Sequence, residues 1–180
     1  EYFKTTGNIP YYISGRILFK LFYNRQLISQ AVLMLQKEVA RRLMAKTSTK
    51  EYGILSVAAQ LAGKPEILFD VSPKCFYPVP EATSSVVSMS FFRDTPWDND
   101  YEGIISLVKS AFNMRRKKLR NALNAYISEK TSFNIKEIED IVRRYDKDWL
   151  SCRAEELTPK NFVELYSFLE NLKKPADNSK

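Results

Sequence analysis

The chain has 180 residues, 44% of them hydrophobic, which suits one domain, or one domain with a small appendage, around a substantial core. Lys and Arg total 28 against 21 Asp and Glu, a net charge of +7, and histidine is absent, so we expect no metal site. The two cysteines, Cys75 and Cys152, lie far apart in the sequence and fit neither a disulfide framework nor a zinc motif. No segment has the pattern of a membrane span or of a secretory leader. We therefore expect a soluble cytoplasmic protein.

The first part of the chain alternates between helical and strand patterns of apolar residues. In chain order these predict a strand, a helix, a strand, two helices and two strands, over residues 3–6, 14–22, 28–35, 36–46, 52–61, 65–71 and 85–92. This order is typical of an α/β domain, and the last two strands, joined without a helix, predict an antiparallel edge. Because the first strand has barely begun, one edge of a doubly wound sheet would be unpaired, so we expect part of a larger domain.

Composition changes at residues 94–100, a polar stretch that predicts a linker. Beyond it apolar residues recur at helical spacing, which predicts a small all-helical domain over 101–173, followed by a flexible tail over 174–180. Thr158 and Pro159 are typical of the N-cap and first position of a helix, and they predict the start of the last one.

The tetrapeptide Asn8-Ile9-Pro10-Tyr11 combines hydrogen-bond acceptors with an aromatic ring. The Asn8 side-chain oxygen can accept a hydrogen from an amino group. Pro10 has no N–H and holds its neighbours extended, so its carbonyl and those beside it are expected to face a cleft without a ladder partner. Two such acceptors would favour a pyramidal amine nitrogen, while Tyr11 stacks on the attached ring. On these residues alone, a strand-to-loop turn in which Asn8 satisfies local backbone groups is an equally good interpretation.

Positive charge is concentrated in one short segment of the second part. Residues 1–93 carry twelve basic and six acidic residues, whereas 94–180 carry sixteen and fifteen. Five of six consecutive positions there are cationic: Arg115, Arg116, Lys117, Lys118 and Arg120. Since apolar residues from Leu119 to Tyr126 have helical spacing, we expect a basic helix that contacts phosphates, with a solvated helix face as the commoner alternative for a charge run.

Motifs spread over nearly the whole chain resemble one enzyme family. They occupy residues 8–11, 36–43, 52–57, 76–80, 111–121 and 153–157. In this order they resemble the small-subunit ribosomal RNA adenine dimethyltransferases, the KsgA/Dim1 family, which transfer methyl groups from S-adenosylmethionine to N6 of two adjacent adenosines near the 3′ end of that RNA. The resemblance implies a partial Rossmann-like class I methyltransferase sheet over residues 1–93 and an RNA-binding helical domain. It also implies a role in ribosome biogenesis, with small-subunit RNA or an immature 30S particle as partner, and we expect a monomer.

The resemblance assigns roles to particular residues of the first part. Asn8 and the Pro10 carbonyl would receive the adenine amino hydrogens, and Tyr11 would stack on the base. Phe76 would form a second aromatic wall, because a base removed from its stack needs new stacking partners. From the sequence alone, a core aromatic after a strand is the better interpretation of Phe76.

The cofactor part of the family's site is expected to be missing. Gly7 and Asn8 would border the methionine end of the S-adenosylmethionine pocket. The glycines stand at 7, 15, 53, 63 and 103, so no glycine-rich strand-to-helix loop can hold that cofactor. We therefore predict a fragment that is inactive alone. Tyr12 also departs from the family, which usually has Asn there, and could add stacking area or fill space.

Further expectations concern RNA contacts and alternative functions. Lys37 and Arg41, with Arg42, begin a helix close in sequence to the tetrapeptide, and RNA backbone contacts, salt bridges to Glu38 and solvation are equally good interpretations. The cations at 115–120 would grip RNA phosphates. The 23S-type adenine methyltransferases share the tetrapeptide motif, and a non-catalytic RNA-binding or ribosome-assembly module is a further alternative.

Overall fold

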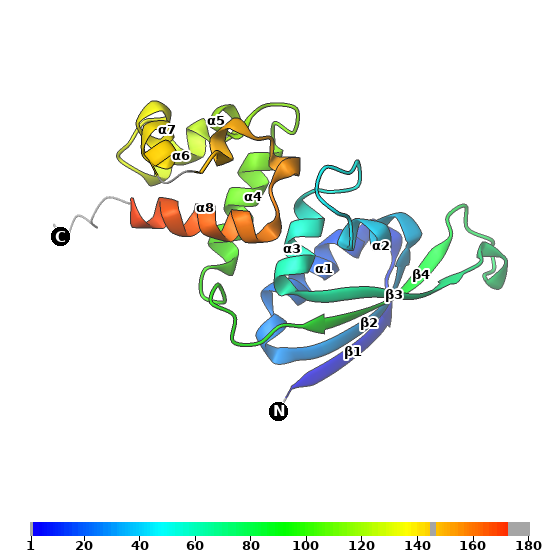
Figure 1. Ribbon diagram of the computed structural model, residues 1–180. Coiled ribbons are helices and arrows are strands. Elements are labelled where there is room, and N and C mark those ends of the chain that lie inside the picture. The colour runs from blue at the N-terminus through cyan, green and yellow to red at the C-terminus, as the bar shows by residue number, and fades with distance from the viewer. Residues whose placement is uncertain (1, 145–146, 173–180) are drawn as a thin grey trace. The chain divides into compact units, whose positions relative to one another are not determined.

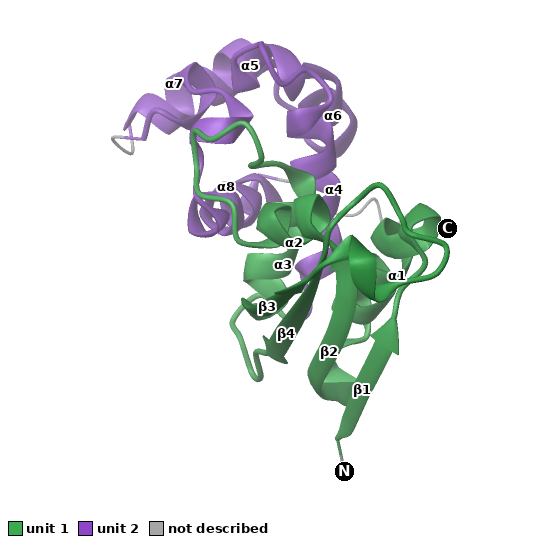
Figure 2. Cartoon of the chain, turned by 90° about the vertical axis from the view of Figure 1, so that its right-hand side faces the viewer, with its two compact units in different colours: residues 1–98 green, residues 99–180 purple. Residues whose placement is uncertain are grey.

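The computed structural model describes residues 2–144 and 147–172, which form two compact units. Figure 2 shows the first, residues 1–98, in green and the second, residues 99–180, in purple. The division between Asp98 and Asn99 falls inside the stretch predicted as a linker. The tail predicted over 174–180 lies outside the described residues.

The first unit is a mixed β-sheet with helices on one face (Figure 1). Its strands are β1 (Phe3–Asn8), β2 (Ile28–Gln36), β3 (Gly63–Val71) and β4 (Ser84–Phe91), and its α-helices are α1 (Ser14–Tyr23), α2 (Lys37–Leu43) and α3 (Ile54–Ala62). The strand order is β1-β2-β4-β3, with β1 parallel to β2 and β4 antiparallel to both of its neighbours. The predicted α/β order and antiparallel edge are confirmed, and β1 forms the other edge.

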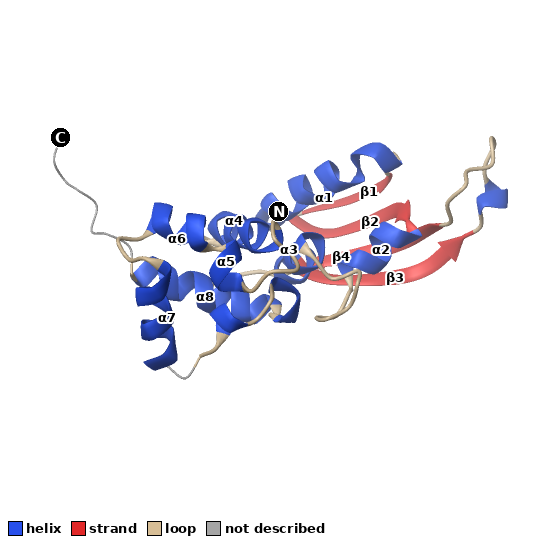
Figure 3. Cartoon of the chain, turned by 90° about the horizontal axis from the view of Figure 1, so that it is seen from above, coloured by secondary structure: helices blue, strands red, loops and turns tan. Residues whose placement is uncertain are grey.

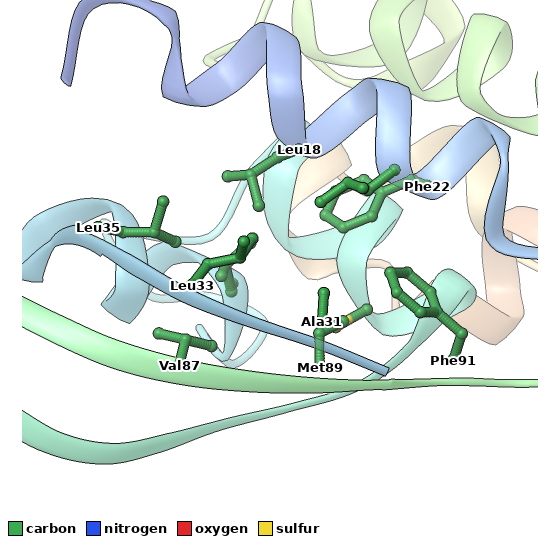
Figure 4. A pocket seen from close by; sticks show the side chains of 10 residues that line it. Leu18, Phe22, Ala31, Leu33, Leu35, Val87, Met89 and Phe91 are labelled. Atoms are coloured by element: carbon green, nitrogen blue, oxygen red, sulfur yellow. The ribbon is translucent and has the colours of Figure 1, made fainter. Parts of the chain in front are cut away.

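The core of this unit lies between α1 and the inner face of the sheet. Successive strand residues point to opposite faces, so Ala31, Leu33 and Leu35 of β2 all face the same way and are buried. Figure 4 shows them, with side chains of β4, pointing toward Leu18 and Phe22 of α1. The gap among these side chains is only about 10 Å³ and wholly apolar, so this is packed core and not a ligand site.

Four element boundaries of the first unit differ from the sequence expectation by two or three residues. Strand β1 ends at Asn8 rather than at residue 6, and α3 begins at Ile54 rather than at residue 52. Helix α2 ends at Leu43, three residues before the predicted end at Lys46. Strand β3 begins directly at Gly63, not at Pro65. A Cβ atom at Gly63 would lie 2.2 Å from the Ser90 carbonyl oxygen, so glycine is required here by the close approach of β3 to β4.

The described part of the second unit is helical (Figure 3). Its α-helices are α4 (Tyr101–Phe112), α5 (Leu119–Ala122), α6 (Asn124–Lys130), α7 (Ile135–Arg144) and α8 (Pro159–Asn171). The Thr158 hydroxyl accepts a hydrogen bond from the Asn161 N–H at 3.2 Å, which confirms the predicted N-cap. The single helix expected from Leu119 to Tyr126 is wrong: the backbone departs from regular helical geometry at Leu123, where φ is −97° and ψ is 0°, and this divides the segment into α5 and α6.

Candidate functional site

The tetrapeptide lies where β1 ends and the chain turns toward α1. Asn8 is the last residue of β1 and stands opposite Met34 of β2, and the Ile9 N–H donates to the Met34 carbonyl at 3.1 Å. A short 3₁₀-helix, Tyr11–Ile13, then leads into α1. The Asn8 side chain is exposed and makes no hydrogen bond within residues 2–144 and 147–172. This result argues against the alternative in which Asn8 satisfies local backbone groups.

One pocket contains most of the predicted first-unit site. Its volume is about 280 Å³, close to the roughly 300 Å³ at the lower end of small-ligand pockets. It is lined by residues from the end of β1, from β2 and from the loop before β4: Asn8, Ile9, Pro10, Tyr11, Met34, Phe76, Tyr77, Pro78 and Pro80. The structure therefore places an amide side chain between elements that carry aromatic rings and prolines, an arrangement able to hold a flat ring bearing an amino group.

Tyr11 is held in this pocket by a residue that the sequence analysis missed. Its phenol oxygen lies 2.8 Å from the hydroxyl oxygen of Ser84, the first residue of β4. Ser84 is buried at 1% exposure, so the contact anchors the ring to the sheet. No local signal pointed to Ser84, because its position depends on how β4 pairs with Gln36 of β2.

The Pro10 carbonyl does not have the free acceptor positions expected of it. It accepts hydrogen bonds from the Ile13 N–H and from the Ser14 hydroxyl, both at 3.2 Å. A carbonyl oxygen has two lone pairs, so this turn uses both. The neighbouring Ile9 also lines the pocket, and no hydrogen bond to its carbonyl occurs in the described residues. Among the carbonyls considered from the sequence, that of Ile9 is the better second acceptor.

Phe76 and Tyr12 differ in their relation to the pocket. Phe76 is half-buried and lines the pocket, so it is not the core aromatic that the sequence alone favoured. It follows a short 3₁₀-helix, Pro73–Cys75, whose Pro73 carbonyl accepts from the Phe76 N–H at 3.1 Å. Tyr12 is 88% exposed and does not line the pocket, so it fills no space there.

A second hollow, about 390 Å³ in volume, continues from the same loop. Its lining comes from the end of β2, from α2, from the loop before β4 and from Glu51: Gln36, Lys37, Glu38, Arg41, Glu51, Ala82 and Thr83. Lys37 is ion-paired with Asp70, and this hydrogen-bonded ammonium lowers the Asp70 pKa below its usual value. Arg42 is ion-paired with Glu38, so the salt-bridge alternative holds for that pair. Arg41 is exposed and has no ion pair in the described residues.

The basic segment of the second unit is a turn rather than a basic helix. Residues 113–118 connect α4 to α5, and only Arg120 of the five cations lies on a helix. Arg115 is ion-paired with Glu155 at 2.7 Å, and Arg120 lies 3.6 Å from Glu139. The predicted basic helix is wrong because the Lys118 backbone is extended, with φ −63° and ψ 151°, so α5 begins only at Leu119.

Within this basic segment, two of the cations share a hollow of about 410 Å³. Its lining residues are Met114, Lys117, Arg120, Asn121, Asn124 and Ile135. Arg115, Arg116 and Lys118 do not line it. The structure thus brings together Lys117, Arg120 and two amide side chains, and separates them from the remaining cations.

Gly7 was predicted to border the methionine end of a cofactor pocket, and its surroundings do not require a glycine. A Cβ atom at Gly7 would meet the Ile9 Cδ1 atom at 3.4 Å, an ordinary contact, so this glycine does not form a cradle that only glycine permits. No other glycine of the sequence lies near the tetrapeptide in a strand-to-helix loop.

Two kinds of feature are absent from the described ranges, 2–144 and 147–172. No cluster of three or more cysteine or carboxylate side chains there could hold a metal ion. None of the helices in the same ranges combines the length and apolar character needed to cross a membrane.

A sheet that begins parallel and ends antiparallel, with an amide-and-aromatic pocket at the end of β1, defines a class I methyltransferase-like α/β fold. The family model described as Ribosomal RNA adenine dimethylase matches residues 1–152, and the chain belongs to this family. Methyltransferases of this kind generally use S-adenosylmethionine.

Individual relatives support the same assignment. The chain is 42% identical over 168 residues to ribosomal RNA small subunit methyltransferase A of Salinibacter ruber, covering 93% of this chain and 53% of that protein. It therefore spans about half of that relative's length. The crystal structure of a dimethyladenosine transferase from Plasmodium falciparum matches with a TM-score of 0.81 and 25% identity, over 96% of this chain and 70% of that one. The 23S rRNA methyltransferase ErmE matches with a TM-score of 0.60 and 22% identity, over 94% and 66%, which shows the fold alone.

Proposed function

We propose that the full-length protein uses S-adenosylmethionine to dimethylate N6 of two adjacent adenosines near the 3′ end of small-subunit (16S) ribosomal RNA, as a step of ribosome biogenesis. The observation that carries the proposal is the shared pocket of Asn8, Tyr11 and Phe76. Family membership and the name of the relative at 42% identity support the same substrate class.

The proposed chemistry follows from the properties of an exocyclic amine. Its lone pair is delocalised into the purine ring, which makes the nitrogen a poor nucleophile. The Asn8 side-chain oxygen accepts one amino hydrogen and the Ile9 carbonyl the other, which favours a pyramidal nitrogen and stabilises the positive charge that develops on it. Tyr11 and Phe76 provide stacking surfaces that replace the stacking an extruded base has lost, a cost of about a few kcal/mol.

The proposal divides these tasks along the chain. Residues 1–93 supply the substrate side of the methyltransferase domain, and the helical residues after the linker supply RNA contacts through Lys117 and Arg120. The loop that holds most of S-adenosylmethionine lies outside this chain, with Gly7 and Asn8 bordering its methionine end. Lys37 and Arg41 contact the RNA backbone near the extruded base, and the chain by itself is inactive.

The partner and location follow from the proposed substrate. The protein acts as a monomer in the cytoplasm on small-subunit RNA or on an immature 30S particle. The net charge of +7 supports binding to a polyanion. Sedimentation of the full-length protein with and without immature particles checks the partner and the oligomeric state together.

Two alternatives predict different behaviour. A 23S-type methyltransferase would modify large-subunit RNA, and its solved representative shares the fold at 22% identity. A non-catalytic assembly module would bind RNA through the basic residues and leave adenosine unmethylated. The pocket around Asn8 favours an enzyme over a binding module, because an exposed amide without a protein partner has no evident structural role there.

The test compares full-length wild-type protein with its Asn8→Ala variant on immature 30S particles. Dimethyladenosine is quantified by mass spectrometry of digested RNA. Removing one acceptor of developing charge is expected to lower the rate about 100-fold to 1,000-fold. The control is Asn24→Ala, an exposed asparagine at the end of α1 that should leave the rate unchanged. Equal rates for wild type and Asn8→Ala would refute the role given to Asn8, and the absence of dimethyladenosine with wild-type protein and S-adenosylmethionine would overturn the proposed function.

A further inference from the structure

Tyr77 is a large aromatic residue that the protein leaves fully in water. Its exposure is 100%, although its neighbour Phe76 is half-buried in the same pocket lining. A buried aromatic side chain contributes on the order of 1.5–3 kcal/mol through the hydrophobic effect, and Tyr77 contributes none of this to the fold. Because it stands at the rim of a pocket, this exposed ring offers an open face on which an aromatic group next to a bound ligand can stack.

The loop that carries Tyr77 connects the two hollows of the first unit. Phe76 and Tyr77 line the base pocket, whereas Ala82 and Thr83 line the hollow beside α2. The Thr83 carbonyl accepts a hydrogen bond from the Lys37 N–H at 2.9 Å, which ties this loop to the start of α2. A polymer with one unit in the pocket of Asn8 and Phe76 would therefore meet Tyr77 at the rim of that pocket. The hollow beside α2 leaves room for its next units.

The charge of this part of the chain favours a polyanionic polymer. Residues 1–93 carry twelve basic and six acidic residues. The lining of the second hollow is itself balanced, with Lys37 and Arg41 beside Glu38 and Glu51. Lys37 is ion-paired with Asp70 and Glu38 with Arg42, so Arg41 is the lining cation that has no ion pair in the described residues. A π-face at the rim and an excess of cations in this part of the chain are the two features with which proteins hold single-stranded nucleic acid.

We propose that Tyr77 stacks on the base next to the one held in the pocket, so that the site binds a step of two adjacent bases of single-stranded RNA. This inference rests on the proposed function, in which two neighbouring adenosines are modified. While one adenine lies between Tyr11 and Phe76, the other lies on the Tyr77 ring. Tyr77 is then a substrate-positioning residue that acts on binding and on the choice of substrate, not on the methyl transfer itself.

The test measures binding of short single-stranded RNAs to the full-length protein by fluorescence anisotropy. One RNA carries two adjacent adenines with abasic nucleotides on both sides, and a second RNA has one of the two adenines removed as well. Tyr77→Ala is expected to weaken binding of the two-adenine RNA about 5-fold to 150-fold, the range that about 1–3 kcal/mol of stacking represents. It should change binding of the one-adenine RNA less than about twofold, because the remaining base occupies the pocket and nothing is left to stack on the rim.

Two further variants separate the stacking role from an effect of the hydroxyl group and from a general loss of exposed aromatic surface. Tyr77→Phe keeps the ring and is expected to bind the two-adenine RNA as wild type does, whereas a loss equal to that of Tyr77→Ala would assign the effect to the hydroxyl group and overturn the stacking role. Tyr2→Ala removes a tyrosine that is 63% exposed and directly precedes β1, at the opposite end of that strand from the pocket. This variant should bind both RNAs as wild type does. A Tyr77→Ala protein that binds both RNAs normally, or loses both equally, also overturns the proposal.

Kinetics distinguish failure of this inference from failure of the proposed function. With the two-adenine substrate, Tyr77→Ala should raise KM by the same factor as it weakens binding and leave kcat within about twofold, because uniform binding has been removed. If Asn8→Ala abolishes methyl transfer while Tyr77→Ala leaves KM unchanged, the proposed function stands and the role of Tyr77 is refuted. If the wild-type protein forms no dimethyladenosine on the two-adenine substrate, the proposed function itself is refuted, whatever Tyr77→Ala does to binding.

Discussion

The phenol oxygen of Tyr11 and the hydroxyl oxygen of Ser84 lie 2.8 Å apart, which joins the turn after β1 to the first residue of β4. This contact spans the sheet at the point where the pocket opens, and it restrains the ring that is proposed to stack on the base. Because Ser84 is almost completely buried, solvent competes little for the contact.

Loss of this contact should weaken substrate positioning moderately. Ser84→Ala and Tyr11→Phe are each expected to lower kcat/KM up to about tenfold, since one hydrogen bond contributes roughly 0.5–1.5 kcal/mol. Tyr11→Ala, which removes the ring itself, should cost more than either. The double variant Ser84→Ala with Tyr11→Phe is the control: it should cost no more than one single change, and additive losses would show that the two groups act separately.

Neutralising Lys117 and Arg120 together should weaken RNA binding by the full-length protein and flatten its dependence on salt. Each phosphate contact that is lost is expected to reduce the slope of log K against log salt concentration by about 1. Binding is measured over a salt series. Arg143 and Lys160 are exposed on α7 and α8, and their joint replacement by Gln removes the same charge away from the hollow. Identical slopes for the two double variants would assign Lys117 and Arg120 to general solvation.

Gly103→Ala should destabilise the second unit. A Cβ atom there would lie 2.1 Å from the Tyr166 Oη atom, so the buried Tyr166 side chain would have to leave its place against α4, at a cost of about 1–3 kcal/mol in the free energy of unfolding. The matched control is Gly15→Ala in α1, where a Cβ meets nothing within 4 Å and alanine should stabilise by about 0.4–1 kcal/mol. Urea unfolding measures both, and equal stability of the two variants would contradict the packing argument.

Asp98 should stabilise the first unit in a pH-dependent manner. Its side chain accepts a hydrogen bond from the buried Arg25 guanidinium at 2.9 Å. Burial raises the Asp98 pKa, but hydrogen bonds from Thr95, Gln26 and Arg25 outweigh this effect and lower it below the usual value. Because the pKa is lowered in the folded state, the stabilisation is complete above the unfolded value of about 3.9 and is lost as pH falls through the folded value.

The corresponding variant is Asp98→Asn, measured by urea unfolding at neutral pH and near pH 3. At neutral pH it is expected to lose up to about 3–5 kcal/mol, the cost of leaving a buried cation without its carboxylate. The difference from wild type should begin to shrink below the unfolded pKa of about 3.9 and shrink further as pH falls through the folded pKa, because protonation removes the charge of the native carboxyl. Asp140→Asn, an exposed aspartate of α7, should show no such change. A deficit of equal size at both pH values would exclude the proposed linkage.

Much of the architecture could be predicted because it depends on patterns of residue types that are local in the sequence. A mostly apolar run marked β2, helical spacing of apolar residues marked α1, and Thr158 with Pro159 marked the start of α8. The tetrapeptide identified an acceptor and an aromatic ring by residue type alone. Each of these signals depends on neighbours within one or two turns of chain, which a sequence displays directly.

Only the tertiary structure decided which groups are available and which meet. It brought Phe76 into the pocket of Asn8, paired Tyr11 with Ser84, occupied the Pro10 carbonyl through Ser14, and divided the basic run between a turn and α5. The physical reason is that strand register and side-chain satisfaction are properties of the whole folded sheet. Whether a hydrogen-bond acceptor is free depends on partners that can lie far away along the chain. Even when the partner is only a few residues away, as Ser14 is from Pro10, the path of the turn decides whether the two groups meet.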